Sequence, residues 1–270
     1  MVNADIGSFR FGIQVPESSL RVIITGASGG LGFALAQHYL EQGALVGALA
    51  RRSDLLQSLY EKFPRQVLCY PLDVRDSFAL QAAAEDFIAR IGVPDIVIAN
   101  AGVSVGTLTE YAEDISAFQQ VMDINVLGML KTFQPFLMQM RNRSQGTLVG
   151  IASVAGFRGL PGAGAYSASK AAAISYLESL RVELCDSGVK VVTICPGFIK
   201  TPMTSINPYR MPFILNADEA ASKIARAIQS QTAFVVVPWQ MKIVASFLKI
   251  LPRKLYDRLF ADAPRKPRQV

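Results

Sequence analysis

The fold is decided by the stretch Leu20-Arg-Val-Ile-Ile-Thr25 and the turn that follows it, Gly26-Ala-Ser-Gly-Gly-Leu-Gly32. The first run is short, apolar and β-branched, which is typical of a strand buried on both faces. Residues 33–42 then have the composition of a helix. Glycines let the backbone approach a pyrophosphate, and the free N–H groups of a helix N-terminus attract an anion. The order strand, glycine turn, helix therefore predicts a dinucleotide phosphate site.

Apolar strands and helices alternate along the rest of the chain. Further strands are expected at 44–50, 66–71, 95–99, 147–153, 189–194 and 233–237. Helical stretches are expected from the N-cap Asp76 to about Ile91, across 115–140, after a small-residue loop at 155–164 to about Cys185, and over 218–228. This alternation predicts an α/β fold with a doubly wound parallel sheet, the Rossmann fold, in a single domain.

Four segments follow from this pattern. They are an N-terminal extension (1–19), the Rossmann domain (20–237), a substrate lid within it (198–216) and an amphipathic basic C-terminal segment (238–270). The lid contains Phe, Ile, Met and Tyr residues, which suit an apolar substrate, although loop packing explains them equally well.

In such a sheet ligands bind beyond the carboxyl ends of the strands. The expected strand ends carry Gly26, Ala50, Asp73, Asn100, Ser153 and Pro196. After the second strand, where NAD-binding folds place a carboxylate for the ribose 2′-OH, this chain has Arg51 and Arg52. A guanidinium suits a 2′-phosphate instead. We therefore expect NADP(H) rather than NAD(H); the alternative is that both arginines only face water.

Tyr166 and Lys170 lie four residues apart, which places them on one helix face. A tyrosine titrates near pH 10 in isolation, and a neighbouring ammonium lowers that pKa. The pair can serve as an acid/base catalyst, but the same spacing also occurs by chance on solvated helices.

The composition excludes several classes of function. The chain has 27 Lys and Arg against 21 Asp and Glu, yet residues 240–270 hold eight basic and two acidic side chains, which leaves nineteen of each sign elsewhere. A nucleic-acid face on the main domain is therefore not expected. The odd, irregularly spaced cysteines and the single His38 disfavour a disulfide framework, a metal site and a Ser-His-Asp hydrolase. Residues 1–19 lack the pattern of a secretory signal, and no apolar run reaches the ~20 residues of a membrane span.

With these residues assembled, the chain resembles the short-chain dehydrogenase/reductase family, in its single-domain form, from about Leu20 to Thr201. The markers are Thr25-Gly26-x-x-x-Gly30-x-Gly32, Asp73, Asn100-Ala101-Gly102, Asn125, Ser153, Tyr166-x-x-x-Lys170 and Pro196-Gly197.

The resemblance implies a role for each marker. Tyr166 would donate a proton to a carbonyl oxygen as hydride arrives, Ser153 would bind the same oxygen, and Lys170 would lower the tyrosine pKa and bind the nicotinamide ribose. Asn125 would help to hold a water that links Lys170 to solvent. The implied cofactor contacts are Gly26, Ser28, Gly30, Leu31, Gly32, Arg51, Arg52, Asp73, Val74, Asn100, Ala101, Gly102, Tyr166, Lys170, Pro196, Gly197, Ile199 and Thr201. Many NADP-using members carry a basic residue just before the second glycine; here that residue is Gly29, so the NADP preference depends on Ser28, Arg51 and Arg52.

The leading hypothesis is an NADP(H)-dependent enzyme that interconverts a carbonyl and an alcohol on a hydrophobic substrate. A nucleotide-sugar epimerase or dehydratase, or a non-catalytic NADP-binding sensor or scaffold, are the alternatives. The resemblance further implies a cytoplasmic homo-oligomer. The basic segment 238–270 either lies on an anionic membrane surface, at its inner face, or packs on its own domain or a neighbouring subunit.

Overall fold

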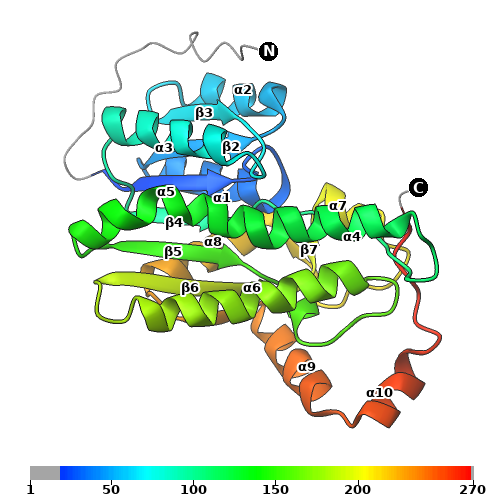
Figure 1. Ribbon diagram of the computed structural model, residues 1–270. Coiled ribbons are helices and arrows are strands. Elements are labelled where there is room, and N and C mark those ends of the chain that lie inside the picture. Colours follow the sequence, from blue (N-terminus) through cyan, green and yellow to red (C-terminus); the bar gives the residue numbers. More distant parts are fainter. Residues whose placement is uncertain (1–18, 269–270) are drawn as a thin grey trace.

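The computed structural model describes residues 19–268, so the expected extension at 1–19 lies almost wholly outside the described residues (Figure 1). Seven parallel strands form one sheet in the order β3-β2-β1-β4-β5-β6-β9. The strands are β1 (Arg21–Thr25), β2 (Leu45–Ala50), β3 (Val67–Pro71), β4 (Ile96–Ala99), β5 (Gly146–Ile151), β6 (Val189–Pro196) and β9 (Phe234–Val237). The doubly wound Rossmann fold predicted from the sequence is confirmed.

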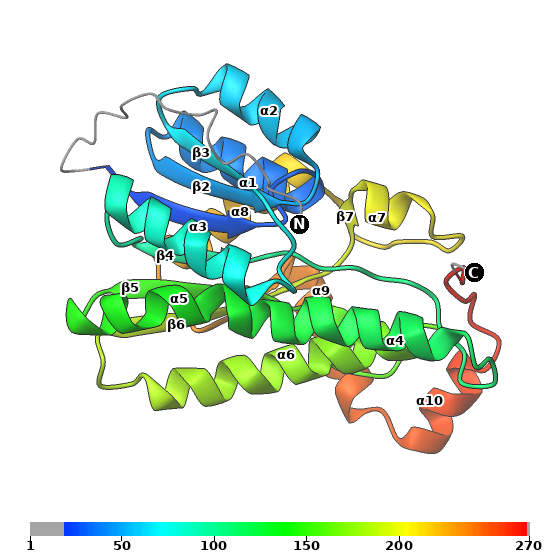
Figure 2. The same cartoon turned by 45° about the horizontal axis from the view of Figure 1, so that its top comes forward.

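Helices cover both faces of this sheet, because successive side chains of a strand point to opposite sides. Val22 and Ile24 of β1 belong to one core, and Ile23 between them belongs to the other. The first core is closed by α1 (Gly30–Glu41), α2 (Ser53–Lys62) and α8 (Ala217–Gln229). The second is closed by α3 (Ser77–Arg90), α5 (Gly128–Asn142) and α6 (Gly164–Glu183) (Figure 2). Strands covered on both faces explain the near-continuous apolar runs in the sequence.

Several helices differ from the sequence expectation. No sequence signal predicted α2, and its N-cap residue Arg52 makes no side-chain capping bond. By contrast, Asp76 caps α3 as predicted, accepting hydrogen bonds from the amides of Phe78 and Ala79 at 2.9 and 3.0 Å. The stretch expected over 115–140 divides into α4 (Asp114–Met122), a π-helical turn (Asp123–Leu127) and α5. A π-turn shifts the faces of the helices on either side of it, and such turns are frequent at functional sites.

The chain after β6 builds one end of the molecule. It contains β7 (Ile199–Lys200), α7 (Pro202–Ser205) and β8 (Leu215–Asn216), three short elements within the expected lid. After β9, α9 (Trp239–Ile250) and α10 (Arg253–Phe260) extend from the edge of the sheet, and the chain then returns toward α4 (Figure 1). No helix within residues 19–268 combines the length and the apolar character that crossing a bilayer requires.

Candidate active site

A cavity of about 420 Å³ opens at the carboxyl ends of the strands, where the sequence placed the ligand site. Nineteen of the twenty residues predicted for the site line it: Gly26, Ser28, Gly30, Leu31, Gly32, Arg51, Arg52, Asp73, Val74, Asn100, Ala101, Gly102, Ser153, Tyr166, Lys170, Pro196, Gly197, Ile199 and Thr201. Asn125 does not line it, but its neighbour Ile124 does. Residues scattered over 176 positions of the chain are thus brought together by the parallel sheet.

The ends of β1 and β4 are joined by polar contacts beneath the cavity. The Thr25 hydroxyl accepts hydrogen bonds from the amides of Asn100 and Ala101, at 3.1 and 3.2 Å. The Asn100 side-chain amide donates in return to the Thr25 carbonyl at 2.9 Å. Gly26 has φ +70°, and a Cβ there would lie 2.9 Å from the Ala101 Cα. Only a glycine fits this junction, because a side chain would be strained and would collide with β4.

The glycine turn leaves room for an anionic group against the first turn of α1. Gly30 has φ +53°, and a Cβ there would lie 3.0 Å from the Thr201 methyl group. The N-cap position, Gly29, carries no side chain, so no side chain satisfies the first amides of α1. Free amides, a positive helix end and bare backbone together match a pyrophosphate. The residues of this turn therefore fit a dinucleotide.

Two arginines flank the turn at the end of β2. Arg52 donates to the Ser28 carbonyl at 3.1 Å and to its hydroxyl at 3.3 Å, so its guanidinium lies over the glycine turn. Arg51 is exposed and also lines the cavity. Asp73 is paired with Arg75 at 2.7 Å, and the hydrogen bonds from Arg75 lower the pKa of the Asp73 carboxyl, with a smaller contribution from the Arg51 charge. The part of the cavity beside the ends of β2 and β3 is therefore rich in guanidinium groups.

Three side chains of the predicted catalytic set meet beyond β5. The Ser153 hydroxyl lies beside the Tyr166 side chain, where it acts to lower the pKa of the phenol. The Ser153 oxygen also accepts from the Ala155 amide at 3.1 Å. Lys170 donates to the Ile151 carbonyl at 2.8 Å, and its nitrogen lies 5.8 Å from the centre of the Tyr166 ring. Two hydroxyls and an ammonium are thus held together by the end of one strand and the first turns of α6.

The charge state of this group follows from its burial. Burial raises the pKa of Tyr166, and the neighbouring Ser153 hydroxyl opposes that rise. Burial lowers the pKa of Lys170 to about 8, because the ammonium loses its hydration. Tyr166 is therefore protonated near neutral pH and can donate a proton. That Lys170 lowers the pKa of Tyr166 stays a prediction, because the hydrogen bond that its ammonium makes goes to the Ile151 carbonyl.

Asn125 lies in the π-turn and is completely buried. Its side-chain oxygen accepts from the Val103 amide at 2.8 Å, and its nitrogen donates to the Val103 carbonyl at 3.0 Å and the Ser169 hydroxyl at 2.9 Å. A Cβ on Gly102 would lie 3.2 Å from the Asn125 oxygen and 3.6 Å from the Lys170 nitrogen. Asn125 therefore fixes the loop after β4 next to Lys170.

Some residues of the site carry no sequence signal of their own. The Ile151 carbonyl is a backbone group that any residue would supply. The cavity is also lined by Gly29, Ala50, Leu72, Val103, Ile124, Ile151, Ala152, Pro202, Met203 and Thr204. Ala50 was expected at a strand end, and each of the others lies within three residues of a predicted site residue, so adjacency along the chain is the signal that points to them.

Comparison with known proteins agrees with this geometry. The family model for short chain dehydrogenase matches residues 21–209. An uncharacterized oxidoreductase of Myxococcus xanthus is 39% identical over 89% of this chain and 96% of the relative. Ketoacyl reductase HetN of a Nostoc species is 30% identical over 85% of this chain and 82% of the relative.

Solved structures show the same fold. A short chain dehydrogenase of Burkholderia cenocepacia in complex with NADP has a TM-score of 0.76 and 26% identity, covering 89% of this chain and 98% of that one. An enzyme of Burkholderia phymatum in complex with NAD has a TM-score of 0.77 at 22% identity, covering 97% of this chain and all of that one. The chain belongs to the short-chain dehydrogenase/reductase family, as an oxidoreductase that uses a nicotinamide dinucleotide and acts on alcohol or carbonyl groups.

Proposed function

We propose that the protein is an NADP(H)-dependent oxidoreductase that interconverts a ketone or aldehyde and its alcohol on a hydrophobic substrate. The observation that carries this proposal is that the Ser153 and Tyr166 hydroxyls and the Lys170 ammonium line the same cavity as the glycine turn. When bound, the dinucleotide would supply or accept the hydride.

The side chains supply the proton and hold the substrate. The Ser153 and Tyr166 hydroxyls converge on the cavity, so both can bond to one carbonyl oxygen. Tyr166 keeps its proton until negative charge develops on that oxygen, and then donates it. Lys170 places a positive charge beside the tyrosine ring, where it favours the phenolate left behind. Asn125 acts on this set indirectly by holding the loop at Gly102.

Preference for NADP(H) is supported by Arg51 and Arg52, the two guanidinium groups at the end of β2. Neither is neutralised by a bidentate carboxylate in the described part of the chain, and the Asp73 carboxylate is already held by Arg75. A 2′-phosphate placed there would meet positive charge, whereas a bare 2′-hydroxyl would find no acidic acceptor at the end of β2. Arg51 and Arg52 would hold that phosphate.

The substrate class is supported by the lid. Phe198 and Tyr209 contact each other with ring centres 6.4 Å apart. Met203, Ile206, Phe213 and Ile214 stay exposed around them. An apolar lid beside the catalytic hydroxyls favours a lipid-like or steroid-like ketone, and a relative named as a ketoacyl reductase is consistent with a long acyl substrate.

The test combines a substrate screen with one substitution. NADPH oxidation is measured over ketones, ketosteroids, long-chain acyl ketones and aldehydes, and Tyr166→Phe is then compared on the best substrate. We expect kcat to fall by about 10² to 10⁴, because proton transfer is lost, while NADPH binding is retained. Tyr176→Phe, on the same helix but away from the cavity, is the matched control and should keep full activity. Turnover by Tyr166→Phe at the wild-type rate would refute the assigned acid.

A further inference from the structure

One face of α9 carries large apolar side chains that the domain does not cover. Trp239, Ile243, Phe247 and Ile250 are 66%, 62%, 57% and 79% exposed. Their spacings of four, four and three residues align them on a single stripe. The opposite side of the helix is used for packing, because Met241 and Ala245 are buried. Met241 and Ala245 therefore anchor α9 to the domain, while the large apolar side chains of the stripe face outward.

The short helix α10 repeats this arrangement. Leu255 and Leu259, four residues apart, are 45% and 60% exposed. The inner side is held by Tyr256, whose hydroxyl donates to the Gly159 carbonyl at 2.6 Å and whose ring lies 4.4 Å from the Arg158 guanidinium. Both helices are thus attached to the domain through one side and present leucine, isoleucine and aromatic side chains on the other. Figure 1 shows the pair extending from one end of the sheet.

The same two helices carry five basic side chains that are not in ion pairs. Lys242, Lys249, Arg253, Lys254 and Arg258 are exposed, and none forms an ion pair with a carboxylate within residues 19–268. The chain before residue 240 holds nineteen basic and nineteen acidic side chains, so the net charge of +6 arises from the C-terminal segment. On a helical projection of α9, Lys242 and Lys249 lie together along one side of the apolar stripe.

We propose that α9 and α10 form a docking surface for an anionic lipid bilayer. An exposed apolar stripe bordered by unpaired lysines and arginines matches the boundary between acyl chains and negatively charged headgroups. The stripe is anchored to a folded domain and its helices are too short to span, so the helices lie in the interface plane. Charge complementarity favours lipid over a second copy of this chain, whose docking surface would carry the same positive charge.

This surface lies close to the cavity. A Cβ on Gly197, a cavity residue, would lie 2.7 Å from the Met241 side chain of α9. Met241 shares a buried cluster with Ala152 and Cys195 at the ends of β5 and β6. A docked α9 would therefore hold the active site near the membrane, where a lipid-like substrate resides. This last consequence depends on the proposed function, whereas the docking itself does not.

The test is sedimentation of the full-length protein with vesicles of phosphatidylcholine, with and without phosphatidylglycerol. We expect binding to the anionic vesicles and release by salt. Phe247→Ser/Ile250→Ser and Lys242→Gln/Lys249→Gln change exposed residues only, and each should reduce partitioning about tenfold or more, since one basic side chain near such a surface contributes about fivefold. Phe78→Ser is the matched apolar control, because Phe78 is 90% exposed on α3, and it should bind as wild type does.

Three outcomes would overturn the docking surface. The first is that the wild-type protein fails to bind anionic vesicles. The second is that the α9 variants bind them as well as wild type does. The third is that the wild-type protein binds no lipid but self-associates in size-exclusion chromatography, and that the apolar double variant abolishes this self-association. Circular dichroism and NADPH binding of each variant establish that the fold is intact. The vesicle assay needs no turnover, so its failure is distinguishable from failure of the proposed reaction.

Discussion

The Lys170 ammonium donates a 2.8 Å hydrogen bond to the Ile151 carbonyl, at the end of the strand that leads to Ser153. This contact joins α6 to β5 and holds the ammonium at 5.8 Å from the Tyr166 ring centre. Lys170 is also almost fully buried, and an ion taken out of water is destabilised unless its partners compensate for the lost hydration. Burying the charged Lys170 beside Tyr166 therefore lowers the stability of the folded protein. Because the lysine can lose its proton, this loss of stability depends on pH.

The free energy of unfolding should reveal that cost. Burial lowers the pKa of Lys170 from 10.5 to about 8. Below the lowered value both folded and unfolded chains hold the proton and the cost is present in full; between about 8 and 10.5 the unfolded chain holds more protons, so stability rises with pH. Lys170→Met removes this titration. In urea unfolding at a series of pH values, the stability of wild type relative to Lys170→Met should rise across this window, and a constant difference would contradict the lowered pKa.

Arg51→Ala should discriminate between the two cofactors. A hydrogen bond to a charged group contributes about 1.5–3 kcal/mol, so NADPH affinity should fall roughly 10- to 100-fold while NADH affinity changes little. Dissociation constants from titration of intrinsic or cofactor fluorescence would show the difference. Arg65→Ala, an exposed arginine that does not line the cavity, serves as the control and should leave both affinities unchanged. Equal losses for NADPH and NADH would remove the argument for a 2′-phosphate site.

Replacement of Asn125 by Leu should destabilise the fold. The amide satisfies both backbone groups of the half-buried Val103, and leucine can satisfy neither. Each backbone group left without a partner costs about 1–3 kcal/mol, so we expect the free energy of unfolding to fall by about 2–6 kcal/mol. Ser169→Ala removes the third Asn125 contact and the bond from the Ser169 hydroxyl to the Tyr166 carbonyl, but leaves both Val103 bonds, and should cost about 1–2 kcal/mol. Urea unfolding measures both, and a loss no larger than that of Ser169→Ala would show that the Val103 loop holds its position without Asn125.

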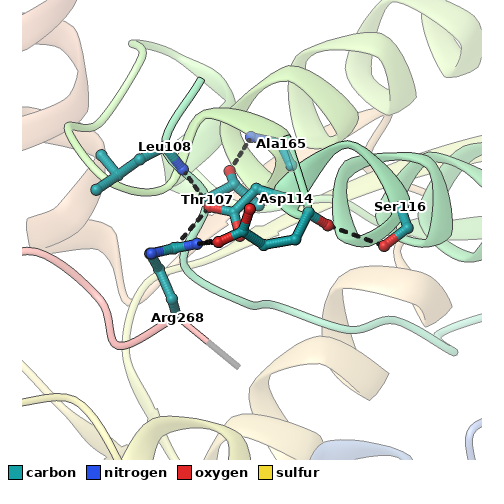
Figure 3. Close-up of polar contacts among 7 residues, drawn as sticks. Thr107, Leu108, Asp114, Ser116, Ala165 and Arg268 are labelled. Atoms are coloured by element: carbon teal, nitrogen blue, oxygen red, sulfur yellow. Dashed lines mark hydrogen bonds and ion pairs between the residues drawn. The ribbon is translucent and has the colours of Figure 1, made fainter. Parts of the chain in front are cut away.

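Arg268 ties the end of the described chain to α4. It donates to Asp114 at 2.8 Å and to Glu113 at 2.8 Å, and it lies 3.6 Å from the centre of the Tyr111 ring. Figure 3 shows the Arg268–Asp114 pair next to the hydrogen bond from the Ala165 amide to the Thr107 hydroxyl. Ala165 immediately precedes Tyr166 in the chain. The end of the described chain is thus attached close to the start of α6, the helix that carries Tyr166.

Arg268→Gln should release this segment. The Gly106 amide, which donates to the Pro267 carbonyl at 3.0 Å, should then exchange its hydrogen markedly faster. Hydrogen exchange followed by mass spectrometry or NMR measures this, with Arg258→Gln, an unpaired arginine of the same segment, as the control. The hydrogen bonds from Arg268 and Leu108 lower the pKa of Asp114, so the tie is complete above the usual aspartate range and is lost as the pH falls through the lowered value. Unchanged protection of Gly106 in Arg268→Gln would show that Arg268 does not hold the segment.

Local sequence determined the parts of this protein whose physics is local. A β-branched run such as Val22–Thr25 forms a buried strand wherever both of its faces are covered, and the Tyr166–Lys170 spacing places both side chains on one helix face. Gly26 and Gly30 adopt positive φ values that other residues rarely tolerate, so the turn is also marked in the sequence. These signals were sufficient for the fold class and for most of the cavity lining.

The tertiary structure decided everything that depends on residues distant in the chain. The bonds from Asn125 to Val103 and Ser169 exist only because the π-turn, the β4 loop and α6 meet in space. Which side of α9 is covered depends on the edge of the sheet on which Met241 packs, and helical periodicity alone gives an apolar face without its partner. Arg268 and Asp114 are 154 residues apart, and no local propensity links them. The sequence alone therefore specifies which residues are chemically equipped to act, while packing determines which of them meet.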